Sequence, residues 1–550
     1  MNKLFGLTIL TVMFFGAMPS SAQAQYTRQD SLRGSITPER IWWDLTYYHL
    51  DVNVDIDNKF ISGKNEVHFK VLTPNEVMQI DLQPPMTIDK VLQNGKVLKV
   101  RHETNAHFIE LTEMQREGAQ MQLDIYYSGN PIEAKNAPWD GGIVWSKDKK
   151  GNPFVASACQ GIGASVWWPC IDHSYDEPDS MLISATVPAE LMDVSNGRLR
   201  KVDENGDGTK TYHWFVSNPI NNYGVNINIG NYAHFSEQYE GEKGSLDMDY
   251  YVLKYNLKKA KKQFKQAVMT IEALEHWFGP YPFYEDGYKL VEAPYLGMEH
   301  QSSVTYGNGY SNGYKGRDLS SSGWGMKFDF IIVHESGHEW FANNITNIDV
   351  ADMWIHESFT SYSENLFLDY HFGNKASSEY VIGTRLNIVN DEPIIVDYGV
   401  NQRGSIDIYY KGSNILHTLR QIVNDDEKWR QTLRGLNKEF YHQTVSTKQV
   451  ENFISQQVGI NLRSFFDQYL RDARIPVLEY FIKDNTLNAR WTNCLTEFDM
   501  PLKIRSNGNE HWINPSTEWQ ALDLNDSIDS IQIDKNFYVG SMDVLGSQKN

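Results

Sequence analysis

The chain has 550 residues, of which 41% are hydrophobic and 13% aromatic, enough for several cores and too many for an intrinsically disordered protein. Seventy acidic against 50 basic residues give a formal net charge of −20. This charge argues against nucleic acid or an anionic membrane as partner and slightly favours cationic substrates. Three cysteines leave at least one unpaired, so no disulfide framework holds the fold.

The N-terminal segment has the features of a secretory signal peptide. Lys3 supplies the positive start, residues 4–18 form an apolar stretch, and Ala22-Gln23-Ala24 is a cleavage site of the small-x-small kind. We expect residues 1–24 to be removed and the protein to be exported to the periplasm or the exterior. No other run approaches the roughly 20 apolar residues of a membrane-spanning helix, so we expect a soluble mature protein without a transmembrane segment.

Alternation of hydrophobic and polar residues marks the next part of the chain. In residues 50–57 hydrophobic and polar side chains alternate, as in strands that bury one face. Asn94-Gly95 and Asn196-Gly197 are typical of tight turns between paired strands. We therefore predict an N-terminal all-β domain over residues 25–253.

The spacing of hydrophobic residues becomes helical at Lys254 and stays so until Gly279-Pro280. A mostly helical region continues, and we predict one domain over residues 254–475. Alternation then returns and predicts a small β domain over residues 476–550. About three domains is the number expected for the roughly 525 residues after the signal peptide, so the predicted fold class is multi-domain α+β.

The motif that carries chemistry is His334-Glu335-Ser336-Gly337-His338. Residues four apart on a helix lie one above the other, so both imidazoles can bind one metal ion. Glu335 flanks the metal, where it can take a proton from a water that the metal has made acidic. The surrounding residues 324–344 are largely apolar and lack proline, which predicts a buried helix.

A second helical pattern over residues 354–364 carries Glu357, nineteen positions after His338, as the third ligand. Glu364 follows seven positions later on the same face and could orient a ligand from behind. The set predicts one hydrolytic zinc ion, Zn2+. The alternative is two core histidines with surface glutamates. Residues 307–325, rich in Gly, Ser, Asn and Tyr, predict a long loop that is either a connector or part of a substrate mouth.

In these motifs the chain resembles the M1 aminopeptidases, a branch of the gluzincins. The two histidines followed by eighteen residues and a glutamate match the zinc signature of that family. Further matches are Gly297-Met298-Glu299-His300, similar to its Gly-x-Met-Glu-Asn exopeptidase motif, Tyr409-Tyr410-Lys411-Gly412, similar to its Tyr-x-Lys-Gly motif, and residues 158–160 and 168–172, similar to its glutamine strand and Pro-Cys-x-Asp block. The resemblance spans roughly residues 40 to 475.

The resemblance implies an N-terminal β-saddle domain, a thermolysin-like catalytic domain, a small C-terminal β-sandwich, and peptides with a free N-terminus as substrates. It assigns the substrate ammonium to Glu299 and Gln160, the oxyanion to Tyr409 rather than Tyr410, and substrate contacts to Gly297, Met298 and His300. His300 replaces the asparagine common in the family, so these contacts could become pH-dependent.

Three other functions compete with aminopeptidase activity. A zinc endopeptidase shares the metal motif but has no need for Glu299, and blocking a peptide's N-terminus separates the two. Epoxide hydrolysis is known in one branch of the family, but nothing in the sequence indicates it. A non-catalytic surface binding protein with a vestigial metal site is disfavoured by the intact ligands, base and tyrosine.

Overall fold

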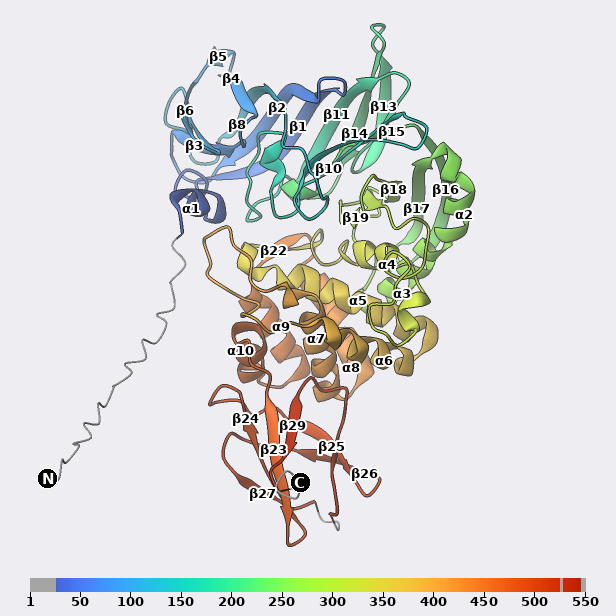
Figure 1. Cartoon of the computed structure of the whole chain (residues 1–550). Coiled ribbons are helices and arrows are strands. Elements are labelled where there is room, and N and C mark those ends of the chain that lie inside the picture. Colours follow the sequence, from blue (N-terminus) through green and yellow to red (C-terminus); the bar gives the residue numbers. More distant parts are fainter. Residues whose placement is uncertain (1–25, 525–527, 546–550) are drawn as a thin grey trace, which may run out of the picture.

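The computed structural model describes residues 26–524 and 528–545; the predicted signal peptide, residues 1–24, lies outside this part. Three regions follow one another along the long axis of the molecule (Figure 1). A broad β region stands at one end, helices fill the middle, and a smaller β region closes the other end. This arrangement confirms the predicted multi-domain α+β fold.

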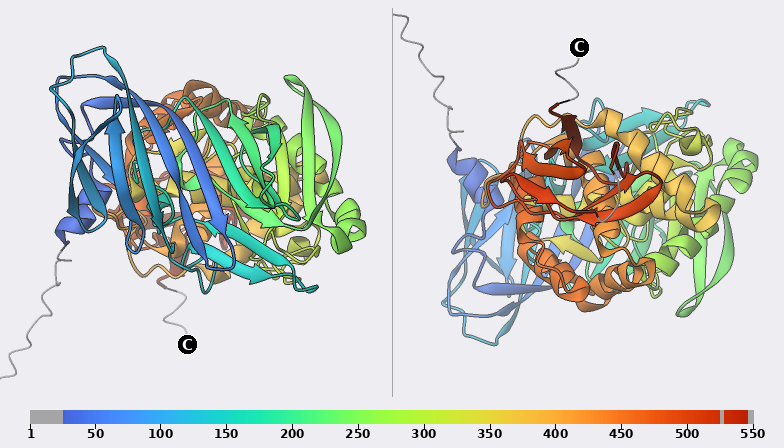
Figure 2. Two further views of the ribbon diagram at one scale, coloured as in Figure 1. Left: turned by 90° about the horizontal axis from the view of Figure 1, so that it is seen from above. Right: turned by 90° about the horizontal axis from the view of Figure 1, so that it is seen from below.

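A large twisted sheet covers one end of the molecule, as the view from above shows (Figure 2, left). In sheet order its strands are β13 (Arg198–Glu204), β14 (Thr209–Val216), β11 (Ser180–Pro188), β1 (Trp43–Asp55), β2 (Phe60–Val71), β8 (Gln120–Gly129), β4 (Thr87–Gln93) and β5 (Lys96–Val97). β1 pairs in parallel with β11 and antiparallel with β2. On β1, Leu50, Val52 and Val54 are buried and Asp51 and Asn53 are exposed, so the predicted alternation reports one buried face.

Two smaller sheets and a short helix complete the N-terminal region. The first sheet contains β12 (Met192–Val194), β15 (Asn228–Gly230), β10 (Pro153–Ala158) and β9 (Gly142–Lys147); the second contains β3 (Val77–Asp81), β7 (Ala106–Glu110) and β6 (Lys99–Glu103); α1 is Arg28–Gly34. β10 ends two residues before Gln160 and so carries it toward the helices.

One of the two predicted hairpin turns is confirmed and the other is wrong. Asn94 and Gly95 connect the paired strands β4 and β5, both with positive φ. Asn196 and Gly197 connect β12 to β13, which belong to different sheets. The buried side chain of Asn196 instead donates hydrogen bonds to the carbonyls of Gly224 and Gln301. Here the Asn-Gly pair links two sheets instead of closing a hairpin.

A five-stranded sheet joins the N-terminal region to the helices. Its order is β16 (Tyr232–Gly241), β17 (Gly244–Leu253), β18 (Tyr288–Glu292), β20 (Val304–Tyr306) and β19 (Gly297–Met298). The last three strands lie where the sequence predicts mainly helix. Every residue of β18, β19 and β20 is buried, so these strands lack the alternation that identifies a half-exposed strand.

Helices make up most of the middle region, and residues 354–368 of its central helix, α5, are all buried. The helices are α2 (Leu257–Gln263), α3 (Lys265–Phe278), α4 (Phe330–Gly337), α5 (Trp354–Phe372), α6 (Asn374–Thr384), α7 (Tyr410–Val423), α8 (Asp426–Glu439), α9 (Thr447–Val458) and α10 (Arg463–Arg471). The predicted helix over 324–344 is wrong in its length. Ala342 has a φ of 144°, which no helix permits, and β21 (Ile345–Asn347) follows to pair with β22 (Gln443–Val445).

The C-terminal β region lies against the helices, as the view from below shows (Figure 2, right). One sheet contains β27 (Gln520–Leu522), β24 (Thr486–Thr492), β23 (Val477–Lys483) and β29 (Gly540–Asp543); the other contains β26 (Asn509–Ile513), β25 (Leu502–Ser506) and β28 (Gln532–Ile533). Trp491 and Phe498 belong to the same buried cluster as the helices. Among the described helices we find none with the length and apolar character of a membrane span.

Candidate active site

The three predicted metal ligands meet between α4 and α5. His334 lies in the last turn of α4, His338 caps the end of this helix, and Glu357 lies in the first turn of α5. Glu357 Oε2 lies 3.7 Å from His334 Nε2 and 3.4 Å from His338 Nε2. All three side chains are buried, and within the described chain Glu357 Oε2 has no hydrogen-bond partner. Since a buried bare carboxylate oxygen is costly, this atom is well placed for a cation.

The Nδ1 atoms of both histidines, which point away from Glu357, are within hydrogen-bonding distance of other groups. His334 Nδ1 lies 2.8 Å from Oε1 of Glu364. The other carboxylate oxygen of Glu364 accepts a hydrogen bond from the Tyr380 hydroxyl. His338 Nδ1 lies 3.0 Å from the carbonyl oxygen of Phe341. In both cases the acceptor requires a proton on Nδ1, which leaves the lone pair of Nε2 directed at the cluster. Two imidazole nitrogens and one carboxylate oxygen are a donor set that fits a single zinc ion.

A second group of three donors overlaps the first. One ligand atom from each of Glu299, Glu335 and His338 also falls within 4.8 Å of the others. This group supplies only one imidazole, and Oε1 of Glu299 already accepts a hydrogen bond from Gln160. The set with two imidazoles and the unpartnered carboxylate oxygen is therefore the better zinc site.

Glu335 and Gly297 approach each other closely where β19 crosses α4. A Cβ added at Gly297 would lie 2.6 Å from Ile331 Cγ2 and 3.1 Å from Glu335 Oε1. Only glycine therefore lets the strand pass this close to the helix. Burial is the main cause that raises the pKa of the Glu335 carboxyl above its usual value, which suits a group that must accept a proton.

Gln160 joins the metal cluster to Glu299. Its Nε2 donates to Glu299 Oε1 over 2.6 Å and to Glu357 Oε1 over 2.8 Å. Glu299 follows β19 and is 3% exposed, and the Asn343 amide donates to its backbone carbonyl. Both amide hydrogens of Gln160 are used in this way, so its Oε1 remains as an acceptor. The cluster thus offers a carboxylate and an amide oxygen beside the metal ligands.

The two adjacent tyrosines occupy different positions. Tyr409 immediately precedes α7, and its ring stacks on that of His334 at 6.1 Å between centroids. Gln160 lies between two neighbouring hollows of one cleft. Tyr409 lines both of these hollows, whereas Tyr410 lines only the one that contains the metal ligands. Of the two phenols, Tyr409 is therefore the one beside both the metal cluster and Gln160.

The cleft consists of two hollows that share Pro138, Trp139, Gln160 and Tyr409. The metal hollow, about 320 Å³, contains the metal ligands, Glu335, Glu299, Gly297 and Met298. The side hollow, about 300 Å³, is lined from the N-terminal region and from the loop before α7. Tyr314 and Leu319 line the metal hollow, so the predicted long loop over 307–325 forms part of its wall.

His300 is the one predicted substrate-contacting residue that the structure does not bring into either hollow. Its side chain is completely buried, and its Nδ1 lies 3.4 Å from the hydroxyl of Thr305. Burial lowers the pKa of His300 to about 3, so this side chain stays neutral near pH 7. The expected pH dependence of substrate contacts through His300 therefore has no support in the structure.

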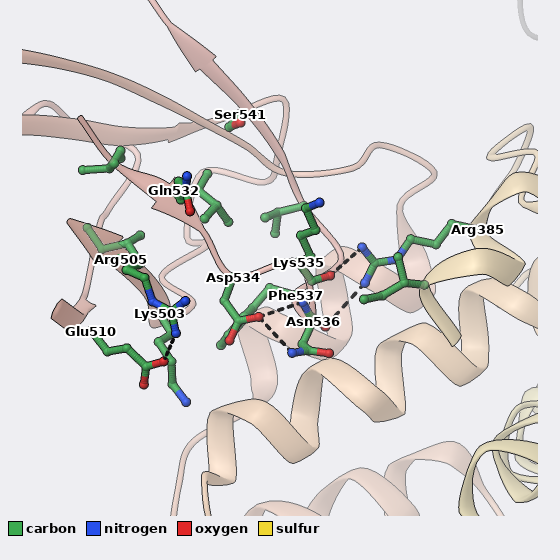
Figure 3. Close-up of a pocket in the computed structure, with 15 residues that line it drawn as sticks. Arg385, Lys503, Arg505, Glu510, Gln532, Asp534, Lys535, Asn536, Phe537 and Ser541 are labelled. Carbon is green, nitrogen blue, oxygen red and sulfur yellow. Dashed lines mark hydrogen bonds and ion pairs between the residues drawn. The ribbon is translucent and has the colours of Figure 1, made fainter. Parts of the chain in front are cut away.

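A larger hollow of about 910 Å³ lies at the other end of the molecule, between the C-terminal sheets and α6 (Figure 3). Three of its charged side chains already have partners: Arg505 and Glu510 pair with each other, and Arg385 donates to the backbone carbonyls of Lys535 and Asn536. None of the metal-ligating clusters in the described part of the chain lies there. Size alone therefore does not make it the reaction site.

Two family models match this chain, side by side. The Peptidase M1 N-terminal domain matches residues 45–223, and the Peptidase family M1 domain matches residues 262–469, which includes the whole metal cluster. The chain belongs to peptidase family M1. The family assignment agrees with the resemblance carried by the motifs.

Several known proteins are similar over most of the chain. Probable aminopeptidase 1 of Sulfurisphaera tokodaii is 22% identical over 88% of this chain and 61% of its own length. Leukotriene A-4 hydrolase of Xenopus laevis is 22% identical over 76% of this chain and 68% of its own length. A solved M1 zinc metallopeptidase from Deinococcus radiodurans has a TM-score of 0.66 at 19% identity, covering 80% of this chain and 98% of that one. The chain thus spans about three fifths of the Sulfurisphaera protein.

Sequence reasoning missed many of the side chains that line this M1 site, and four of them show why. Trp139, Tyr223, Tyr314 and Arg403 line the hollows. Each comes from a loop, a short 3-10 turn or an isolated bridge, where no periodicity or motif marks a residue. The composition of residues 307–325 was the only sequence signal that touched any of them.

Proposed function

We propose that this protein is a monozinc aminopeptidase, which removes the N-terminal residue of peptides. The observation that carries the proposal is the hydrogen bond between Gln160 and Glu357 at 2.8 Å. Because Gln160 also binds Glu299, the acceptors suited to an ammonium stand directly beside the metal ligands. A peptide with its ammonium there has only its first carbonyl within reach of the metal.

The proposed roles follow from the positions of the side chains. Zinc, held by His334, His338 and Glu357, would supply Lewis-acid polarisation of the peptide carbonyl and acidify a water molecule. Glu335 accepts the proton from that water and passes it to the leaving amine. Glu299 binds the substrate ammonium.

Two further groups complete the proposed reaction. The free Oε1 of Gln160 accepts a hydrogen bond from the substrate ammonium. Tyr409 donates a hydrogen bond from its hydroxyl to the carbonyl oxygen as negative charge develops there. Gly297 keeps β19 close to Glu335, and Met298 forms part of the apolar wall.

A panel of aminoacyl fluorogenic amides, assayed with and without a chelator, tests this proposal. We expect turnover that chelation abolishes and that added zinc restores. N-acetylated peptides should be nearly inert, because acetylation removes the charge that Glu299 binds. Efficient cutting of acetylated peptides at internal bonds would instead favour the zinc endopeptidase.

We also propose that the protein is exported and cleaved after Ala24. The proposal rests on the sequence of residues 1–24, which lie outside the described part of the chain. Intact-mass measurement and N-terminal sequencing of the protein from its native host check it. A mature chain that still begins at residue 1 would contradict the proposal.

A further inference from the structure

The side hollow lies where the side chain of the substrate's first residue must go. Glu335 lines only the metal hollow, and the leaving amine must reach Glu335, so the leaving part of the peptide occupies the metal hollow. Gln160 and Tyr409, which hold the ammonium and the carbonyl of the first residue, line both hollows. The remaining substituent of that residue's Cα is its side chain, and the side hollow is open to it.

The charges around the side hollow do not cancel. Arg33 Nε lies 3.0 Å from Asp172 Oδ2, and Arg33 also donates to the carbonyl of Gly161, so this pair is neutral overall. Burial lowers the pKa of His173 to about 4, which leaves that imidazole uncharged. Arg403 also lines the hollow and forms no ion pair or hydrogen bond within residues 26–524 and 528–545. One positive charge therefore remains without a partner.

The position of Arg403 suits it to bind a carboxylate. It lies on the loop before α7, six residues from Tyr409, and is exposed at the mouth of the hollow. A guanidinium stays charged at every relevant pH and binds carboxylates through two parallel hydrogen bonds. The same charge repels a lysine or arginine side chain. At the hollow, the positive charge of Arg403 therefore opposes the protein's net charge of −20. The net charge favours the approach of cationic peptides, but Arg403 disfavours a cationic side chain in the hollow itself.

We propose that the side hollow binds the side chain of the substrate's N-terminal residue and that Arg403 makes it prefer an acidic residue there. This inference rests on the proposed aminopeptidase function. It names Arg403 as a specificity-determining residue whose effect depends on the charge of the first side chain. The partner of Arg403 is the side-chain carboxylate of an aspartyl or glutamyl residue at the substrate's N-terminus.

The test compares two tripeptides that differ only in charge, aspartyl-alanyl-alanine and asparaginyl-alanyl-alanine. The ratio of their kcat/KM values is measured for the zinc-loaded full chain, for Arg403→Gln and for Arg403→Glu. Gln402→Ala serves as the control on the same loop, because Gln402 is exposed and lines neither hollow. Binding of both peptides to Glu335→Gln, with and without Arg403→Gln, gives a second readout that needs no turnover.

We expect the aspartyl peptide to be preferred about 3- to 10-fold, a modest ratio because Arg403 is partly screened by water. The ratio should fall to near one in Arg403→Gln, invert in Arg403→Glu, decrease with added salt and stay unchanged in Gln402→Ala. A wild-type ratio of one or less, or a preference that survives in Arg403→Gln, overturns the inference. If the wild type cuts neither tripeptide nor any aminoacyl amide, the proposed function fails, and the ratio of dissociation constants then decides whether Arg403 selects acidic residues.

Discussion

Gln160 and Glu357 are 197 positions apart in the sequence, yet the amide nitrogen of the first lies 2.8 Å from the carboxylate of the second. The same nitrogen lies 2.6 Å from Glu299. One side chain from the N-terminal β region thus fixes both the proposed ammonium anchor and a proposed metal ligand. Substrate binding and metal binding are therefore coupled through a residue that β10 positions.

Gln160→Leu should weaken both functions at once, because leucine keeps the volume but loses both hydrogen bonds. We expect kcat/KM for free-amine substrates to fall about 10- to 100-fold and zinc affinity to fall as well, as when other outer partners of metal ligands are removed. Competition with a calibrated chelator measures the second effect. The exposed Gln402→Leu is the control. A variant with full zinc affinity would show that Gln160 does not hold Glu357 in place.

Glu335→Gln should separate metal binding from chemistry. The three ligands remain, so zinc content after dialysis should stay near one ion per chain, while kcat falls about 10²- to 10⁴-fold with the loss of the proton acceptor. His334→Ala should lose both zinc and activity. If Glu335→Gln keeps more than a tenth of the wild-type kcat, another group must be the base.

Tyr409→Phe and Tyr410→Phe should differ sharply. Tyr409 stacks beside His334 and lines both hollows, so loss of its hydroxyl should lower kcat about 10²- to 10³-fold with little change in KM. Tyr410→Phe should stay within a few-fold of wild type. Steady-state kinetics on one aminoacyl amide decides between them, and the reverse pattern would move the oxyanion role to Tyr410.

The convergence of His334 and His338 could be predicted from the sequence because α-helix geometry fixes how residues four apart are placed. Helix geometry does not place Glu357, nineteen positions further on, which was predicted as the third ligand from the spacing of the motif. Arg403 and Trp139 could not be predicted, because loops carry no periodicity and their approach to the cleft depends on tertiary packing. The β18–β20 strands escaped prediction because full burial removes alternation. The helix predicted over 324–344 was too long, because an apolar composition indicates burial, and buried residues outside the helix such as Phe328 satisfy it equally well.

Gly297→Ala should disturb the base without touching the metal ligands. The new Cβ would lie 2.6 Å from Ile331 Cγ2 and 3.1 Å from Glu335 Oε1, so the Ile331 and Glu335 side chains, or α4 and β19 themselves, must shift. Because catalysis is sensitive to shifts of about 1 Å, we expect kcat to fall about tenfold or more while zinc content is retained. Adding Ile331→Ala removes the closest contact and should recover part of kcat. Equal kcat in wild type and Gly297→Ala would show that the strand has room to move.

Asp193 should make the stability of the N-terminal region depend on pH. This residue of β12 is completely buried, and burial raises the pKa of its carboxyl well above the usual value. The folded protein therefore binds a proton that the unfolded chain releases above about pH 4. The resulting stabilisation is complete below that pH and is lost as pH rises toward the folded-state pKa, by about 1.4 kcal/mol per pH unit.

Asp193→Asn keeps a neutral side chain at every pH and should remove this slope. Calorimetric unfolding of both proteins between about pH 5 and 8 should therefore show the variant gaining stability relative to wild type as pH rises. Asp57→Asn, at an exposed position, is the matched control and should follow the wild type. Parallel curves for wild type and Asp193→Asn would mean that Asp193 is ionised in the folded protein, with a compensating group or water beside it.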